Sequence, residues 1–243
     1  MALEIGAEGA NLHQWQYGLA STAFRWNVSG SYQQVLPRYV SVDEAGVERE
    51  FLYEGLSAPA EVWKAVFLKG YQWPFDTAKI HGSSQVDFLV YWQTQRLGRR
   101  VYLDFRSNPA GLDEALTGLD AEARAYLERS GALQATPIER LRAMNPQAIA
   151  LYQSHGIDLS RDMLEIDVCV QHHNGGLAVD AHWQTTVPGL YAAGEAAGTF
   201  GAYRPGGSAL NSTQVGSLRA AQHIVYGSAR QPLAKPAFEA AFA

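Results

Sequence analysis

The chain is poor in cysteine and in charge, and it has no long apolar run. Cys169 is the single cysteine among 243 residues, so no disulfide can form within the chain, and a cytoplasmic location is expected. Charged residues make up 18% of the sequence and the net charge is −5 without a long basic run, so nucleic acid is not expected as a partner. No apolar run could span a bilayer, no secretory signal peptide is recognised at the start, and no metal site is predicted.

What the chain does have is the composition of a globular protein that mixes helices and strands. Hydrophobic residues make up 47% of it, and 243 residues suffice for one large domain or two small ones. Alternating and helical spacings of apolar residues predict an α+β or α/β fold. The expected strands are 36–42, 50–52, 86–92, 101–105, 165–170 and 190–193. The expected helices are the end of one at 1–10, then 58–70, 112–131, 137–156 with a break at Pro146, and 212–226.

A glycine-rich stretch covers Val187–Gly216. It begins with an apolar, strand-like run at Leu190–Ala193, which is followed by Gly194 and the carboxylate of Glu195. The loop after them carries a single cation, Arg204, and Ser208–Asn211 begins a helix. Small residues let backbone N–H groups approach a ligand, and a helix N-terminus favours negative charge. The stretch therefore suits a ligand with hydroxyls or anionic oxygens. The alternative is a glycine-rich surface loop without a ligand.

Two segments together form a family pattern. The first is His172-His173-Asn174-Gly175-Gly176. The second begins with Pro-Gly-Leu-Tyr-Ala-Ala-Gly-Glu, which ends at Glu195, and continues through Arg204 to Leu210. In this pattern the chain resembles the C-terminal part of the succinate dehydrogenase/fumarate reductase flavoprotein family. The resemblance is specific over residues 165–225 and looser over the rest of the chain.

The resemblance implies an FAD-binding domain interrupted by a capping domain. The capping (substrate) domain would be residues 10–160, the returning C-terminal piece of the Rossmann-like FAD-binding domain 161–228, and a tail or linker 229–243. The opening piece of such a domain carries G-x-G-x-x-G to hold the pyrophosphate, and this sequence has no such motif. We therefore expect a C-terminal fragment, or a truncated gene product, of a longer protein. Its expected partners are the missing N-terminal FAD-domain segment and a small-molecule substrate.

The resemblance also implies roles for single residues. Gly194 and Glu195 would contact FAD, and the backbone of Ser208, Ala209 and Leu210 would lie against the pyrimidine edge of the flavin. Arg204 would clamp a substrate carboxylate, because a guanidinium is planar and always charged, and His172 would make a second carboxylate contact. The alternatives are a solvated loop carboxylate at Glu195, a surface arginine at Arg204, and a histidine pair with one member buried and one at the surface.

Two departures from the family pattern bear on the substrate. The place of the family's His-Pro-Thr segment is taken by Gln16–Ala20, which has neither His nor Thr, and Arg38 is displaced from the position of the proton-donating arginine. We therefore predict an FAD-dependent oxidoreductase that transfers hydride to or from a small, carboxylate-bearing substrate other than succinate or fumarate, inactive as this fragment alone. The alternatives are a non-catalytic interaction or assembly protein that retains the fold, and a sugar- or nucleotide-binding module.

Overall fold

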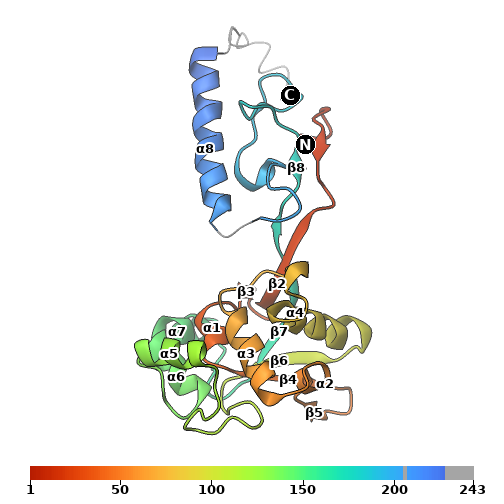
Figure 1. The fold of residues 1–243 in the computed structure, drawn as a ribbon. Helices are drawn as coiled ribbons and strands as arrows, with labels where there is room; N and C mark the ends of the chain where they lie inside the picture. The colour runs from red at the N-terminus through yellow and green to blue at the C-terminus, as the bar shows by residue number, and fades with distance from the viewer. Residues whose placement is uncertain (205–206, 228–243) are drawn as a thin grey trace. The chain divides into compact units, whose positions relative to one another are not determined.

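The computed structural model describes residues 1–204 and 207–227, and the chain forms two compact units. One unit is Gln16–Gln171, and the other joins Met1–Trp15 to the chain from His172 onward. Both are drawn in Figure 1. The two predicted domains, 10–160 and 161–228, have different boundaries from these units, and their identification as cap and FAD-domain piece stays a prediction. The predicted tail at 229–243 lies outside the described residues.

The 16–171 unit is built on a six-stranded sheet with the order β3-β2-β7-β6-β4-β5. The strands are β2 Trp15–Ser21, β3 Trp26–Asn27, β4 Arg38–Val42, β5 Glu48–Arg49, β6 Arg100–Asp104 and β7 Leu164–His173. Strand β6 pairs antiparallel with both β4 and β7. The strands predicted at 36–42, 101–105 and 165–170 are thereby confirmed. The hairpin partner of β4 is also present, but it lies at Glu48–Arg49 rather than at 50–52.

Helices pack against this sheet. They are α1 Ser31–Gln34, α2 Leu52–Gly55, α3 Pro59–Lys69, α4 Ser83–Tyr91, α5 Ala121–Arg129, α6 Pro137–Met144 and α7 Pro146–Ser154, with a 3-10 turn η1 at Thr77–Lys79 and a π-helical turn η2 at Trp92–Arg96. In Figure 1 the green helices α5, α6 and α7 lie together on one side of the unit. The core contains the large buried side chains of the 16–171 unit, among them Leu19, Phe51, Phe67, Phe105 and Leu127.

Local sequence explains the break between α6 and α7. Thr136 and Glu139 form a capping box at the start of α6. Asn145 ends α6 and then caps α7, because its side chain accepts a hydrogen bond from the backbone N–H of Ala148. Pro146 occupies the first turn of α7, where a missing N–H costs nothing. The predicted interruption at Pro146 is confirmed.

The described residues of the smaller unit hold little regular structure. It consists of β1 Gly9–Ala10, β8 Gly176–Leu177, the 3-10 turn η3 Gly194–Ala196, α8 Ser208–Gln222 and a π-helical turn η4 His223–Gly227. Strand β1 pairs antiparallel with β8, and Leu177 bridges in parallel to Ala197. A Cβ on Gly176 would lie 2.5 Å from the carbonyl oxygen of Ala196. Glycine is therefore required where these backbones meet.

The strand predicted at 86–92 is wrong, because these residues lie mostly in helix α4. Val, Phe, Tyr and Trp gave this run a strand-like composition. Val86 and Val90 are both fully buried, and their spacing of four residues places them on one helical face against the core. Packing against α3 overrides the local preference, and it also turns Asp87 inward.

Three further expectations change. Leu190–Ala193 is not a strand: its backbone bonds back to the preceding loop, from Thr185 N to Leu190 O at 2.8 Å and from Ala192 N to Trp183 O at 3.1 Å. Residues 1–10 form turns followed by β1 rather than a helix end.

The helix predicted at 112–131 is confined to α5, because Leu116 and Gly118 have positive φ angles of 57° and 78° that end any helix before it. The helix predicted at 212–226 is present as α8 and η4, beginning at Ser208.

Candidate functional site

Glu195 lies in a tight 3-10 turn between the histidine segment and α8. The turn begins at Gly194, which has a φ of 68°, and a Cβ there would approach the hydroxyl of Thr213 in α8 to 3.2 Å. One carboxylate oxygen of Glu195 accepts a hydrogen bond from the backbone N–H of His173 at 2.7 Å. The side chain of Glu195 is still 54% exposed. The carboxylate therefore ties the end of β7 to the turn and keeps acceptor capacity for a ligand.

The two histidines of this unit have different surroundings. His172 is 7% exposed, its Nδ1 lies 2.9 Å from Oδ1 of Asn174, and its ring makes a T-shaped contact with the ring of Phe200. Its Nε2 lies 3.9 Å from Oε2 of Glu195, which is close enough for an ion pair when the imidazole is protonated. His173 is half-buried, and its ring stacks on Trp15. His172 is thus the buried member of the pair and faces the Glu195 carboxylate.

Arg204 shares the electrostatic environment of Glu195. Partial burial lowers the pKa of Arg204, and the negative charge of Glu195 opposes that fall. Ser208, Ala209 and Leu210 form the first turn of α8, which follows Gly207 with its φ of 79°. Among the residues that the structure describes, no side chain caps this helix end by a hydrogen bond, and no acidic residue lies in its first turn. The first turn of α8 is therefore suited to an electronegative ligand edge.

Arg38 lies in the other unit, at the start of β4. Its guanidinium is surrounded by three carboxylates: Asp104 at 3.2 Å, Glu48 at 3.7 Å and Glu50 at 3.8 Å. Burial raises the pKa of Asp104, but hydrogen bonds from Arg106 and the charge of Arg38 outweigh it, and the pKa is lowered overall. A guanidinium held in this way has a structural role in the fold. Its predicted role as a proton donor stays a prediction.

The buried pair Lys69 and Asp87 was not anticipated from sequence. Asp87 belongs to the segment that was expected to be a strand, and Lys69 ends α3, so no linear motif joins them. The spacing of Val86, Asp87 and Val90 in α4 is the one available signal, since it places the carboxylate beside the apolar face of a helix. Within residues 1–204 and 207–227, no group of three or more His, Cys, Asp or Glu side chains could hold a metal ion.

The residues near Glu195 are compatible with part of a flavin site. A half-exposed carboxylate can accept hydrogen bonds from ribose or ribityl hydroxyls. The first turn of α8 lies at the positive end of the helix dipole, which favours an electronegative ligand edge. Gly194 lets the turn that carries Glu195 pack closely against Thr213 of α8. Such features are what one wall of a flavin site would need, whereas the sequence has no glycine fingerprint for a pyrophosphate.

Known proteins were compared with the chain. The family model described as "FAD binding domain" matches residues 84–210. An L-aspartate oxidase of Pyrococcus abyssi is 30% identical over 158 residues, which are 58% of this chain and 34% of the relative. An L-aspartate oxidase of Streptomyces coelicolor is 38% identical over 81 residues, or 32% of this chain and 14% of the relative. The chain thus spans about a third of the length of the first of these relatives.

Solved structures show the same fold. A quinol-fumarate reductase with menaquinol molecules aligns with 99% of this chain and 37% of its own, at a TM-score of 0.58 and 16% identity. Sdh1 of Mycobacterium smegmatis in complex with UQ1 aligns with 99% of this chain and 34% of its own, at a TM-score of 0.56 and 19% identity. At these identities the likeness concerns the fold alone.

These findings confirm the predicted family, the mixed α/β fold class and FAD as the cofactor. In the part of the chain that the structure describes, no helix has both the length and the apolar character needed to cross a membrane. The family match extends from α4 to the first turn of α8 and includes the segment that carries Glu195 and Arg204. The chain belongs to the FAD binding domain family, as the resemblance to succinate dehydrogenase/fumarate reductase flavoproteins led us to expect.

Proposed function

We propose that the chain supplies the capping domain and the closing piece of the FAD-binding domain of a flavin-dependent oxidoreductase. The single observation that carries this proposal is the turn at Gly194, which presents Glu195 beside His172 while Gly194 itself packs against Thr213 of α8. Glu195 would hold hydroxyls of FAD, and the N–H groups of Ser208, Ala209 and Leu210 would face the flavin. Bound FAD would accept or donate hydride, the part of the chemistry that amino-acid side chains do not provide.

Arg204 and His172 would act on the substrate. A guanidinium forms paired hydrogen bonds with a carboxylate and so fixes its orientation. His172 is buried and paired with Asn174, so its ring is held in one orientation for a second contact. We therefore propose a small carboxylate-bearing substrate. The similarity to L-aspartate oxidases makes L-aspartate the first compound to assay.

Succinate and fumarate are not favoured as substrates. The strand that would carry further carboxylate contacts is β2, and a Cβ on its Gly18 would lie 2.6 Å from the ring of Trp73. Trp73 is 8% exposed and donates a hydrogen bond to the carbonyl of Leu19, so it is fixed in place. No side chain could extend from position 18 while Trp73 fills that space. Arg38 on β4 is held by its three carboxylates. Neither β2 nor β4 is therefore suited to bind the second carboxylate of succinate or fumarate.

We also propose that a segment completing the FAD-binding domain covers α8. Leu210, Val215 and Leu218 are 72%, 52% and 59% exposed along this helix. Apolar side chains at this exposure are normally packed against another element. The segment would bring the dinucleotide-binding motif that this sequence lacks. The chain covers 34% of the Pyrococcus abyssi relative, which is consistent with such a segment. The cytoplasmic location expected from the single cysteine stays part of this proposal.

Flavin content tests the proposal. The protein is purified from its own cells without a denaturing step, together with the segment proposed to complete the FAD-binding domain, and its visible flavin absorbance is measured together with oxidation of L-aspartate. We expect bound flavin, loss of flavin in Glu195→Ala, and loss of turnover with flavin retained in Arg204→Ala. Glu8→Ala is the matched control, because Glu8 is an exposed acid in the same unit. Absence of flavin from the native protein would overturn the proposal.

A non-catalytic assembly protein is the second candidate. It is favoured by exposed aromatic side chains on the 16–171 unit, such as Tyr17, Trp26, Tyr91 and Trp92, each more than 40% exposed. This candidate predicts partner binding that persists in Arg204→Ala and needs no flavin. Loss of the partner on removal of flavin would count against it.

A further inference from the structure

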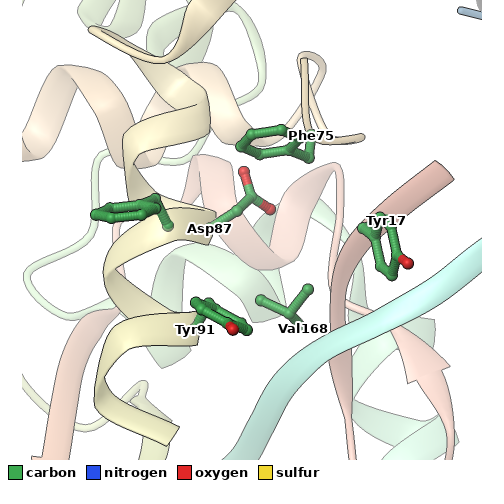
Figure 2. Close-up of a pocket in the computed structure, with 6 residues that line it drawn as sticks. Tyr17, Phe75, Asp87, Tyr91 and Val168 are labelled. Atoms are coloured by element: carbon green, nitrogen blue, oxygen red, sulfur yellow. The ribbon is translucent and has the colours of Figure 1, made fainter. Parts of the chain in front are cut away.

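A pocket lies wholly within the 16–171 unit. None of its lining residues belongs to the segment that carries Glu195. Its volume is about 320 Å³, which falls in the range of pockets that bind small molecules. Four aromatic rings, one aliphatic side chain and one carboxylate line it: Tyr17, Phe75, Phe88, Tyr91, Val168 and Asp87. Figure 2 shows Asp87 and Tyr91 on α4 facing side chains from β2, from the loop before η1 and from β7.

The carboxylate of Asp87 is the polar feature of this pocket. Asp87 is 2% exposed, and its Oδ2 lies 2.5 Å from Nζ of Lys69, which is itself fully buried. Among the described residues, Oδ1 of Asp87 has no hydrogen-bond partner. In Figure 2 the carboxylate points away from α4 toward Phe75 and the side of the pocket where Tyr17 lies. Buried acceptors nearly always receive a hydrogen bond, so this oxygen is suited to a donor from a ligand.

The charges around the pocket limit what it can bind. No cationic side chain is among its lining residues, and Lys69 is already engaged by Asp87 and by the carbonyl of Trp73. A carboxylate in this pocket would be desolvated without a counter-charge. A cation would compete with Lys69 for the same carboxylate. The aromatic walls favour a flat apolar molecule, and the free acceptor position favours one that carries a neutral O–H or N–H group.

We propose that this pocket binds a small neutral aromatic compound with one hydrogen-bond donor, such as a phenol or an indole. The ring would pack between Tyr17, Phe88 and Tyr91, and its O–H or N–H would donate to Oδ1 of Asp87. This site needs no flavin and involves no residue of the Glu195 segment. It therefore goes beyond the proposed oxidoreductase function and does not rest on it.

The test is a ligand-observed NMR titration of the complete 243-residue chain with phenol, anisole and benzoate. Anisole has the shape of phenol without the donor, and benzoate adds a charge. We expect phenol to bind about tenfold more tightly than either, because a hydrogen bond to a charged acceptor is lost in anisole and a charge is buried in benzoate. Equal binding of phenol and anisole, or tighter binding of benzoate, would overturn the proposal.

Substitutions of pocket residues test whether phenol binds in this pocket. Val168→Trp fills it and should weaken phenol binding at least about tenfold. Val170→Trp is the matched control, because it is the same change on the same strand at a 45% exposed residue that does not line the pocket. Tyr91→Ala gives a second reading, since Tyr91 is 42% exposed and its loss leaves the buried core unchanged. Phenol affinity that is unchanged in both pocket variants, or that falls equally in Val170→Trp, would contradict the assignment.

Discussion

The ammonium nitrogen of Lys69 lies 2.5 Å from Oδ2 of Asp87, and the two residues are 0% and 2% exposed. The pair joins the end of α3 to the middle of α4. Burying two charges is costly, and their attraction repays this only while both are present. The pair therefore affects stability in a way that single and double substitutions can separate.

The first prediction concerns removal of one charge or of both. Lys69→Met leaves a buried carboxylate without its partner and should lower the free energy of unfolding by about 3–5 kcal/mol. Lys69→Met combined with Asp87→Leu should cost less than either single change, because no uncompensated charge remains. Urea denaturation of the four proteins measures this. Costs that simply add would show that the pair is not coupled.

The second prediction concerns pH. Burial raises the pKa of Asp87 to about 6 from its usual 3.8, although the charge of Lys69 opposes the rise. Between these two values the folded chain holds more protons on this group than the unfolded chain does. Its contribution to stability is therefore full below about pH 4 and is lost as the pH rises through about 6.

We expect this loss to amount to about 1–3 kcal/mol, because one unit of pKa corresponds to about 1.4 kcal/mol. The measurement is the difference in free energy of unfolding between the native chain and the Lys69→Met/Asp87→Leu protein at several pH values from 4 to 7. The double variant is the control, since it keeps every other carboxylate. A difference that is constant across this range would contradict the prediction.

The third prediction concerns the glycine contact of the smaller unit. A Cβ on Gly176 would lie 2.5 Å from the carbonyl oxygen of Ala196, and backbone cannot move away as a flexible side chain can. Gly176→Ala should destabilise this unit by about 1–3 kcal/mol. Hydrogen exchange should show faster exchange at Leu177 and Ala197, with β4 and β6 unaffected. Ala181→Ser, at an exposed position in the same unit, should change nothing.

The fourth prediction separates the charge of Glu195 from its hydrogen bond. Glu195→Gln keeps an acceptor for the backbone N–H of His173, so the turn should persist. The negative charge next to Arg204 and His172 is lost. We expect FAD affinity to fall by about tenfold or more, since hydrogen bonds to charged groups are the stronger ones. Quenching of flavin fluorescence measures the affinity, with Glu8→Gln as control, and unchanged affinity would remove Glu195 from the flavin site.

Some features of this protein follow from local sequence alone. Thr136, Glu139 and Pro146 set where α6 and α7 begin, because caps and proline act on their own turn of backbone. Valine and tyrosine residues marked β4 and β6 as strands, since β-branched and aromatic side chains fit the surface of a sheet. The ordered series that includes Glu195 and Arg204 was enough to predict the family and FAD.

Other features were decided only by the tertiary structure. Helix α4 forms where composition favours a strand, because Val86 and Val90 pack against the core from one helical face. Gly18 lies under Trp73, and Lys69 reaches Asp87, through contacts between segments that no linear motif connects. Sequence fixes what each residue prefers within its own turn or strand. Burial and charge pairing depend on which distant segments meet, and that is settled only when the whole core packs.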